Sequence, residues 1–223
     1  EPMQWTWPAV VNYYEAKAYC EWLNEQNPGK TFRLPNEAEY LNIRDIDIPD
    51  QQQWQASAEK STAADAVMHV ATAKIYNLNL RFGSESPVDA NAPNSAGFHD
   101  VMGNVWQWCE DAFHPLNEFK IHPYYTDFST PCYDNEHQMI LGGSFISTGD
   151  EASIWSRFHF RPHFFQHAGF RLVTSDGTDN DGGKKYETSQ LVDQYMLFHW
   201  GSDEEQRDEA ITERIGHPGH MNL

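Results

Sequence analysis

The chain has 223 residues, of which 39% are hydrophobic and 14% aromatic, enough apolar material for a sizeable core without disulfide bonds. The formal net charge of −18 would repel a polyanion, which excludes nucleic acid as a partner. No apolar run is long enough to cross a bilayer, and the first residues lack the basic and apolar regions of a signal peptide. We therefore expect no membrane partner.

The three cysteines, Cys20, Cys109 and Cys132, show no C-x-x-C spacing. An odd number of cysteines without such a spacing favours reduced thiols and a cytoplasmic protein. A single disulfide stays open as an alternative.

Apolar residues at helical spacing predict a first helix over Val10–Leu23. Asn12 followed three residues later by Glu15 is the pattern of a capping box, and Asn27-Pro28-Gly29 ends the helix. Phe32–Pro35 then predicts a short strand that stops at its proline.

Asn36 is placed to cap a second helix over Glu37–Ile43, whose first turn is acidic and suits the helix dipole. Residues 45–66 are polar and predict an irregular surface segment. Residues 76–104 are rich in Asn, Gly, Pro and Ser and predict a long loop, which in a compact domain is usually functional or held by an ion.

Four apolar pieces of strand length follow this loop, several of them bounded by glycines. They are Val105–Trp108, Met139–Leu141, Phe158–Phe160 and Phe170–Val173. Residues 174–185 hold almost no apolar side chain and predict a linker, and Tyr186–Trp200 predicts an amphipathic helix.

One stretch offers oxygen atoms for a hard cation such as calcium, which prefers side-chain and carbonyl oxygens in a tight loop. The candidate ligands are Asp100, Gly103, Val105 and Gln107. The competing interpretation, favoured by spacing alone, is a Gly-Asn turn that leads into a buried strand with two tryptophans.

Three histidines, His159, His163 and His167, have the spacing of one helical face and of a metal site. Pro162 makes a continuous helix improbable, which favours a loop or strand rich in arginine and suited to a carboxylate. The sequence contains no G-x-S-x-G, P-loop or complete G-x-G-x-x-G motif, so nucleophilic catalysis is not supported.

Six blocks, in this order, resemble the formylglycine-generating-enzyme/sulfatase-modifying-factor superfamily. They are Trp7–Ala16, Ala18–Leu23, Arg33–Tyr40, Gly103–Trp108, Leu141–Phe145 and Ala168–Arg171. The resemblance implies an α+β fold, a complex variant of the C-type-lectin fold with little regular secondary structure and often with bound calcium.

Two departures from the family pattern affect the expected chemistry. Formylglycine-generating enzymes carry a cysteine pair after the Gly-Gly-Ser block, whereas residues 145–153 here contain none, so copper-thiolate oxidation of a protein cysteine is improbable. Gln107 stands where those enzymes have an acidic calcium ligand, and a neutral amide weakens such a site.

Three further segments resemble a narrower subgroup, the ovothiol-pathway sulfoxide synthases, which join cysteine to histidine with O2 at a non-haem iron. They are Asp127–Cys132, Gly149–Ser153 and His163–Arg171. By this resemblance Tyr125 faces the iron as a catalytic residue, and a substrate-binding stretch comprises Arg157, Phe158, His159 and Arg161. An arginine there suits a carboxylate, which its planar fork binds bidentately.

The resemblance also implies three parts: a sulfatase-modifying-factor-type domain over 1–173, a linker over 174–185, and a helical segment over 186–223 leading to a methyltransferase domain. The iron ligands of the subgroup lie in an upstream helical domain with an H-x3-H-x-E motif, which this sequence lacks. S-adenosylmethionine would bind only downstream. The chain alone is then expected to be inactive.

Two alternatives stay open. One is a C-type-lectin-like binding module without chemistry, because a fold does not determine its function. The other is a sister synthase of the ergothioneine type, against which the segment after Tyr186 argues.

Overall fold

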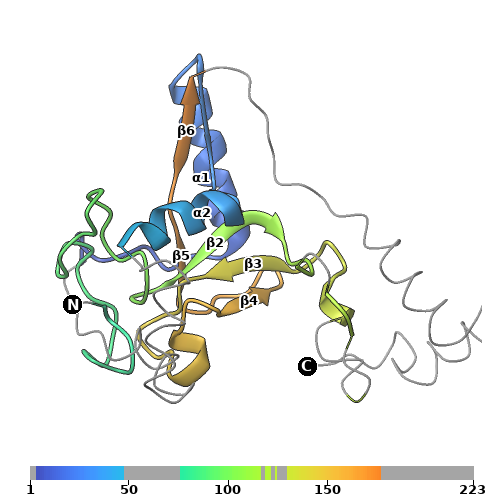
Figure 1. Ribbon diagram of the computed structural model, residues 1–223. Coiled ribbons are helices and arrows are strands. Elements are labelled where there is room, and N and C mark those ends of the chain that lie inside the picture. The colour runs from blue at the N-terminus through green and yellow to red at the C-terminus, as the bar shows by residue number, and fades with distance from the viewer. Residues whose placement is uncertain (1–3, 48–75, 117–118, 122–123, 125–129, 177–223) are drawn as a thin grey trace, which may run out of the picture.

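The computed structural model describes residues 4–47, 76–116, 119–121, 124 and 130–176. Its centre is a four-stranded sheet in the order β4-β3-β2-β5 (Figure 1). The strands span Trp106–Ala112 (β2), Gln138–Leu141 (β3), Arg157–Phe160 (β4) and Ala168–Phe170 (β5). β3 pairs antiparallel with both β2 and β4, and β5 runs parallel to β2. Together with two helices and long loops, this sheet confirms the expected α+β class.

Both helices begin at the predicted capping residues. In α1 (Tyr13–Gln26), Oδ1 of Asn12 accepts the N–H of Glu15 and Oε2 of Glu15 accepts the N–H of Asn12, each at 2.9 Å. Asn36 and Glu39 form the same reciprocal pair at the start of α2 (Glu37–Arg44). These side chains satisfy backbone donors that have no partner within a helix, which fixes where each helix begins. Among the described residues no helix is both long and apolar enough to cross a membrane.

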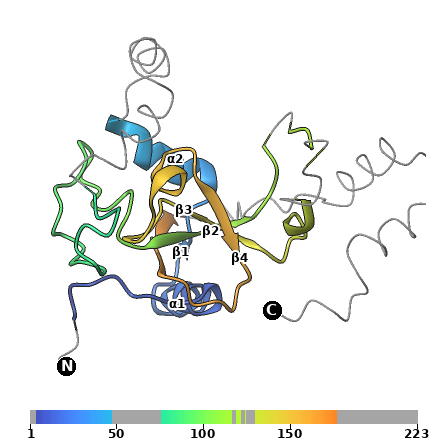
Figure 2. The ribbon, with the colours of Figure 1, turned by 90° about the horizontal axis from the view of Figure 1, so that it is seen from below.

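The sheet lies between the two helices, as the view from below shows (Figure 2). Successive residues of β2 point to opposite faces, so Trp108 packs toward α1 and Cys109 toward α2. The indole Nε1 of Trp108 donates to the carbonyl of Val11 at 2.9 Å, which ties the start of α1 to the sheet. The cluster on the α1 side contains Ala16, Cys20, Leu34, Trp106, Trp108, Ile140 and Ala168. The cluster on the α2 side contains Tyr40, Cys109, Phe113, Tyr133, Met139 and Leu141.

The prediction of one strand over Phe170–Val173 is wrong. β5 ends at Phe170, two residues form a link, and β6 (Val173–Asp176) pairs antiparallel with β1 (Lys30–Arg33) in a second sheet beside α1 (Figure 1). The break occurs because the side chain of Arg171 is bonded to the loop before β2, as described below, and the chain turns away from the first sheet there.

β6 runs across the predicted domain boundary at residue 173. Residues 174–176 belong to a strand whose backbone groups are paired with Lys30–Phe32, so the predicted linker over 174–185 does not begin at 174. The rest of that linker, the surface segment after residue 47, and the predicted helix Tyr186–Trp200 within the segment 186–223 lie outside the described residues.

The predicted loop over 76–104 is confirmed. Among the described residues, the β-pairing of this segment consists of an isolated bridge between Asn77 and Gly103. Buried amide side chains replace the hydrogen bonds of regular structure. Oδ1 of Asn104 accepts the N–H of Ser86 at 2.9 Å, and Nδ2 of Asn104 donates to the carbonyl of Ser86 at 3.0 Å. The backbone N–H of Asn104 donates to the carbonyl of Asn77 at 2.8 Å. These contacts hold the loop against the end of β2.

Gly103 tests how tightly this loop is packed. It has φ of +72°, and an added Cβ would lie 2.5 Å from the carbonyl oxygen of Asn77. Gly97 has a similar φ of +86° with nothing within 4 Å of an added Cβ. We expect Gly97→Ala to lower the free energy of unfolding by about 1 kcal/mol and Gly103→Ala by about 3 kcal/mol, because only the latter adds a clash with backbone. Urea denaturation of both variants measures this, and equal losses would contradict the proposed packing.

Candidate functional site

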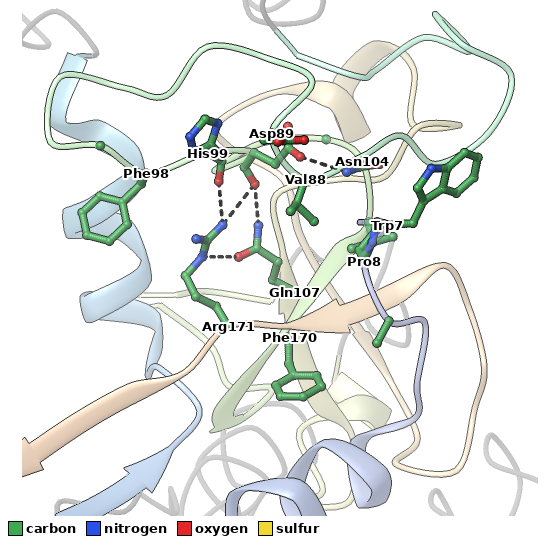
Figure 3. Close-up of a pocket in the computed structure, with 15 residues that line it drawn as sticks. Trp7, Pro8, Val88, Asp89, Phe98, His99, Asn104, Gln107, Phe170 and Arg171 are labelled. Atoms are coloured by element: carbon green, nitrogen blue, oxygen red, sulfur yellow. Dashed lines mark hydrogen bonds between the residues drawn. The ribbon is translucent and has the colours of Figure 1, made fainter. Parts of the chain in front are cut away.

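Arg171 is the centre of a polar network between the two sheets (Figure 3). Its Nε donates to Oε1 of Gln107 at 2.9 Å, and its Nη2 donates to the carbonyls of His99 at 2.9 Å and Asp100 at 3.3 Å. Nε2 of Gln107 donates to the same Asp100 carbonyl at 3.0 Å. One guanidinium therefore connects the link between β5 and β6, strand β2 and the loop that precedes it.

The four predicted calcium ligands all line one cavity of about 510 Å³, which Arg171 also lines (Figure 3). They are Asp100, Gly103, Val105 and Gln107. Two of the candidate side chains already have protein partners. Oδ1 of Asp100 accepts from Asn91 at 3.0 Å and Oδ2 accepts from Asn104 at 2.9 Å, while the amide of Gln107 is bonded as described above.

The charge balance of this cavity rests on Arg171 and Asp100. Burial raises the pKa of the Asp100 carboxyl, and the hydrogen bonds from Asn91 and Asn104 oppose that rise. Burial also lowers the pKa of Arg171, which the nearby Tyr40 and Asp100 partly offset. The cation that the structure places against the carbonyl of Asp100 and the amide of Gln107 is thus a guanidinium, and the calcium site stays a prediction.

Arg157, at the start of β4, is held by α2. Its Nε donates to Oε1 of Glu37 at 2.5 Å and its Nη2 donates to Oε2 at 2.9 Å. The guanidinium carbon lies 5.5 Å from the centroid of the Phe113 ring. Nε2 of His114 lies 3.4 Å from Oε2 of Glu37, the same oxygen that Nη2 of Arg157 contacts. The orientation of Arg157 is therefore fixed by a charge-assisted fork and an aromatic face.

A second cavity, of about 690 Å³, opens beside this arginine. Three of the four predicted substrate-binding residues, Arg157, Phe158 and His159, lie on its wall, whereas Arg161 pairs with exposed Glu136 at 2.9 Å. Tyr125 lies outside the described residues. The full lining is Phe113, Cys132, Asp150, Glu151, Ser153, Trp155, Ser156, Arg157, Phe158 and His159.

His159 belongs to a cluster that the sequence did not predict. One ligand atom each of Cys132, His137 and His159 lie within 4.8 Å of one another. Burial, followed by electrostatic repulsion from the neighbouring His137, lowers the pKa of His159 to about 4, so the His159 ring is neutral at neutral pH. Burial raises the pKa of the Cys132 thiol. The spacing C-x4-H over 132–137 is the one local signal of this cluster, and His159 joins it only through strand pairing.

The other two histidines of the predicted run lie elsewhere. His163 is exposed after β4, and Nδ1 of His167 lies 3.4 Å from Oε1 of Glu85. The interpretation of this run as strand and loop, in preference to a helical metal site, is confirmed.

The family model described as the sulfatase-modifying factor enzyme 1-like domain matches residues 3–176. The chain belongs to this family. It is 30% identical over 116 residues to a formylglycine-generating enzyme of Streptomyces coelicolor, covering 47% of this chain and 32% of that protein. It is 24% identical over 187 residues to the inactive Cα-formylglycine-generating enzyme 2 of Mus musculus, covering 75% of this chain and 48% of that protein. The chain thus spans less than half the length of these relatives.

Among solved structures, Treponema denticola variable protein 1 superimposes with a TM-score of 0.55 at 21% identity, covering 78% of this chain and 73% of that one. This likeness shows the fold, which is the expected sulfatase-modifying-factor type. The matched range includes β6, in agreement with a domain that extends to Asp176.

The role of Arg171 can be tested by stability. Arg171→Met leaves the carbonyl of His99 and the amide of Gln107 without a donor, and we expect it to lower the free energy of unfolding by about 3 kcal/mol. Arg171→Lys should recover only part of this, because an ammonium cannot reproduce the fork. Arg161→Met, which breaks a pair exposed at both ends, should cost less than about 1 kcal/mol. Chemical denaturation compares the three, and a similar loss for Arg161→Met would contradict the assignment.

Proposed function

We propose that the chain is the substrate-binding half of a non-haem iron sulfoxide synthase that joins cysteine to histidine with O2. The observation that carries the proposal is the cavity beside β4, which combines a fixed arginine with two acids and three aromatic rings. The missing cysteine pair after Gly142-Gly143-Ser144 supports it, because that absence argues against the copper chemistry of the enzymes that the family is named for.

The cavity has complementary groups for an amino acid. Glu37 occupies Nε and Nη2 of Arg157, so an α-carboxylate would bind at the remaining Nη1. An α-ammonium is suited to the carboxylates of Asp150 and Glu151. The rings of Phe113, Trp155 and Phe158 offer apolar and stacking surface for an imidazole side chain. The chain's own part in the reaction would be to bind and orient the two amino acids.

The described residues do not fit the proposed iron. Non-haem Fe(II) oxygenases characteristically bind the metal with two histidines and a carboxylate, and the candidate metal group of the described residues contains a cysteine. The proposal assigns that metal to an upstream domain of a longer protein.

The test is an assay of the full-length protein with Fe(II), O2, cysteine and histidine. We expect a histidyl-cysteine sulfoxide as product, and Arg157→Met should raise the KM for an amino-acid substrate at least 10-fold because it removes the carboxylate partner. Mass spectrometry of the products measures the outcome. An iron-loaded, folded preparation that forms no sulfoxide would overturn the proposal.

Tyr125 provides a second, more specific prediction. If its hydroxyl supplies a proton or hydrogen near the iron, Tyr125→Phe should shift the products from sulfoxide toward cysteine sulfinate, the product of dioxygenation. The neighbouring Tyr124, 89% exposed, gives the matched control Tyr124→Phe. The ratio of the two products in each variant is the measurement. An unchanged ratio in Tyr125→Phe would exclude that role for the hydroxyl.

A binding module without chemistry is the rival, and it has one observation in its favour: a relative that matches 75% of the chain is described as an inactive Cα-formylglycine-generating enzyme. The sequence upstream of Glu1 distinguishes the two. A helix with H-x3-H-x-E supports the synthase, and its absence from the full-length protein supports the module.

A further inference from the structure

We propose that Cys132, His137 and His159 bind a zinc ion at the wall of the cavity beside β4, with the fourth coordination position open to that cavity. This site is distinct from the iron of the proposed synthase and does not depend on that function. It lies wholly within the described residues.

The cluster has nearly the dimensions of a zinc site. Its ligand atoms lie within 4.8 Å of one another. Zinc–sulfur and zinc–nitrogen bonds of about 2.3 and 2.0 Å in a tetrahedral arrangement place the ligand atoms about 3.3–3.6 Å apart. The ligand atoms would have to approach one another by up to about 1.5 Å to bind the ion.

The sheet holds two of the ligands in place. His159 is in β4, directly opposite Met139 of β3. His137 comes just before β3, and its carbonyl accepts the N–H of Phe113 at 2.7 Å. The two imidazole rings lie 5.0 Å apart at their centroids, at 87° to one another. Cys132 closes the group at the end of the short helix η2 (Thr130–Cys132).

Asp134 orients His137 in the way that carboxylates orient metal-binding histidines. Its Oδ2 lies 2.9 Å from Nδ1 of His137, which leaves Nε2 of that ring for a metal. Its Oδ1 accepts the backbone N–H groups of Glu136 and His137 at 2.8 and 2.9 Å, so the carboxylate itself is fixed.

His159 supplies an independent reason to expect a ligand. Its Nδ1 is buried and has no hydrogen-bond partner in the structure. Buried polar atoms in folded proteins are nearly always paired, so an orphaned ring nitrogen on a histidine grouped with a thiol and a second imidazole needs a partner. A metal ion bound at that nitrogen would satisfy it.

The donor set favours a transition metal such as zinc over a hard cation. One thiolate and two neutral imidazoles are the ligands of zinc, whereas calcium and magnesium prefer oxygen. Three protein ligands are typical of a zinc ion that keeps one position for water or a substrate. Cys132 and His159 both line the cavity, so that position would face bound ligands.

The experiment uses full-length, tag-free protein under reducing conditions, with zinc measured by mass spectrometry after dialysis. We expect one zinc per chain at this site, and cobalt substitution should give a thiolate-to-cobalt charge-transfer band with the visible spectrum of tetrahedral cobalt. Cys132→Ser and His159→Gln should each lower zinc affinity more than 10-fold and remove or shift that spectrum. Asp134→Asn should lower the affinity about 10-fold while the ligands remain.

His163→Gln is the matched control, because His163 is an exposed histidine three residues beyond β4. It should leave zinc content and the cobalt spectrum unchanged. Circular dichroism of the metal-free variants distinguishes loss of a metal ligand from loss of the fold. If Cys132→Ser does not fold, the zinc affinity of Asp134→Asn tests the site instead.

Two results would overturn the proposal: protein that holds no zinc after dialysis, or a cobalt-thiolate band that survives Cys132→Ser unchanged and so arises from a cysteine other than Cys132. Iron content and sulfoxide formation are measured in the same preparations. Protein that binds zinc but contains no iron and forms no sulfoxide would count against the synthase alone. Protein that contains iron and forms sulfoxide but binds no zinc would count against the zinc site alone.

Discussion

The partly buried guanidinium of Arg171 is the interaction on which the rest of the structure depends. A cation removed from water to this extent needs matched acceptors, and here Gln107 and two loop carbonyls supply them. Those carbonyls reach it because the loop adopts left-handed backbone conformations at Asp100, Gly103 and Asn104. The long loop therefore needs little regular structure, since its shape is set by one charge and by buried amides. The same arginine turns the chain from the first sheet into the second.

The two cavities differ in how completely their polar groups are paired. Around Arg171 the side chains of Asp100, Asn104 and Gln107 have partners within the chain, as expected of a group that maintains the fold. Beside β4, Nδ1 of His159 is buried without a partner, in a residue grouped with a thiol and a second imidazole. Unpaired buried polar atoms cost stability and call for an explanation such as an unseen ion. This difference supports the proposed site beside β4.

Local signals were enough to predict both helix starts, because a capping box such as Asn36 with Glu39 acts over three residues. The fold was predicted from the family resemblance. Hydrophobic periodicity could not have predicted it, because the strands are only three to seven residues long. The division of Phe170–Val173 between two sheets was not predictable, because it depends on acceptors in residues 99–107. The cluster of Cys132 and His159 was missed for the same reason: only the β3–β4 register joins residues 27 positions apart.

The turn after β3 illustrates how one scaffold can carry different chemistry. In this chain Ser144 and Ser147 are buried there, and Oγ of Ser147 accepts the N–H of Ser144 at 3.0 Å. The turn is thus closed by a short hydroxyl bond in a segment where the family's named enzymes are expected to carry reactive thiols. The partly buried thiol of Cys132 lies instead beside β4, with two imidazoles. The turns that contain glycine maintain the fold. The side chains between these turns determine where a metal or a substrate could bind, and in this chain the proposed place is beside β4.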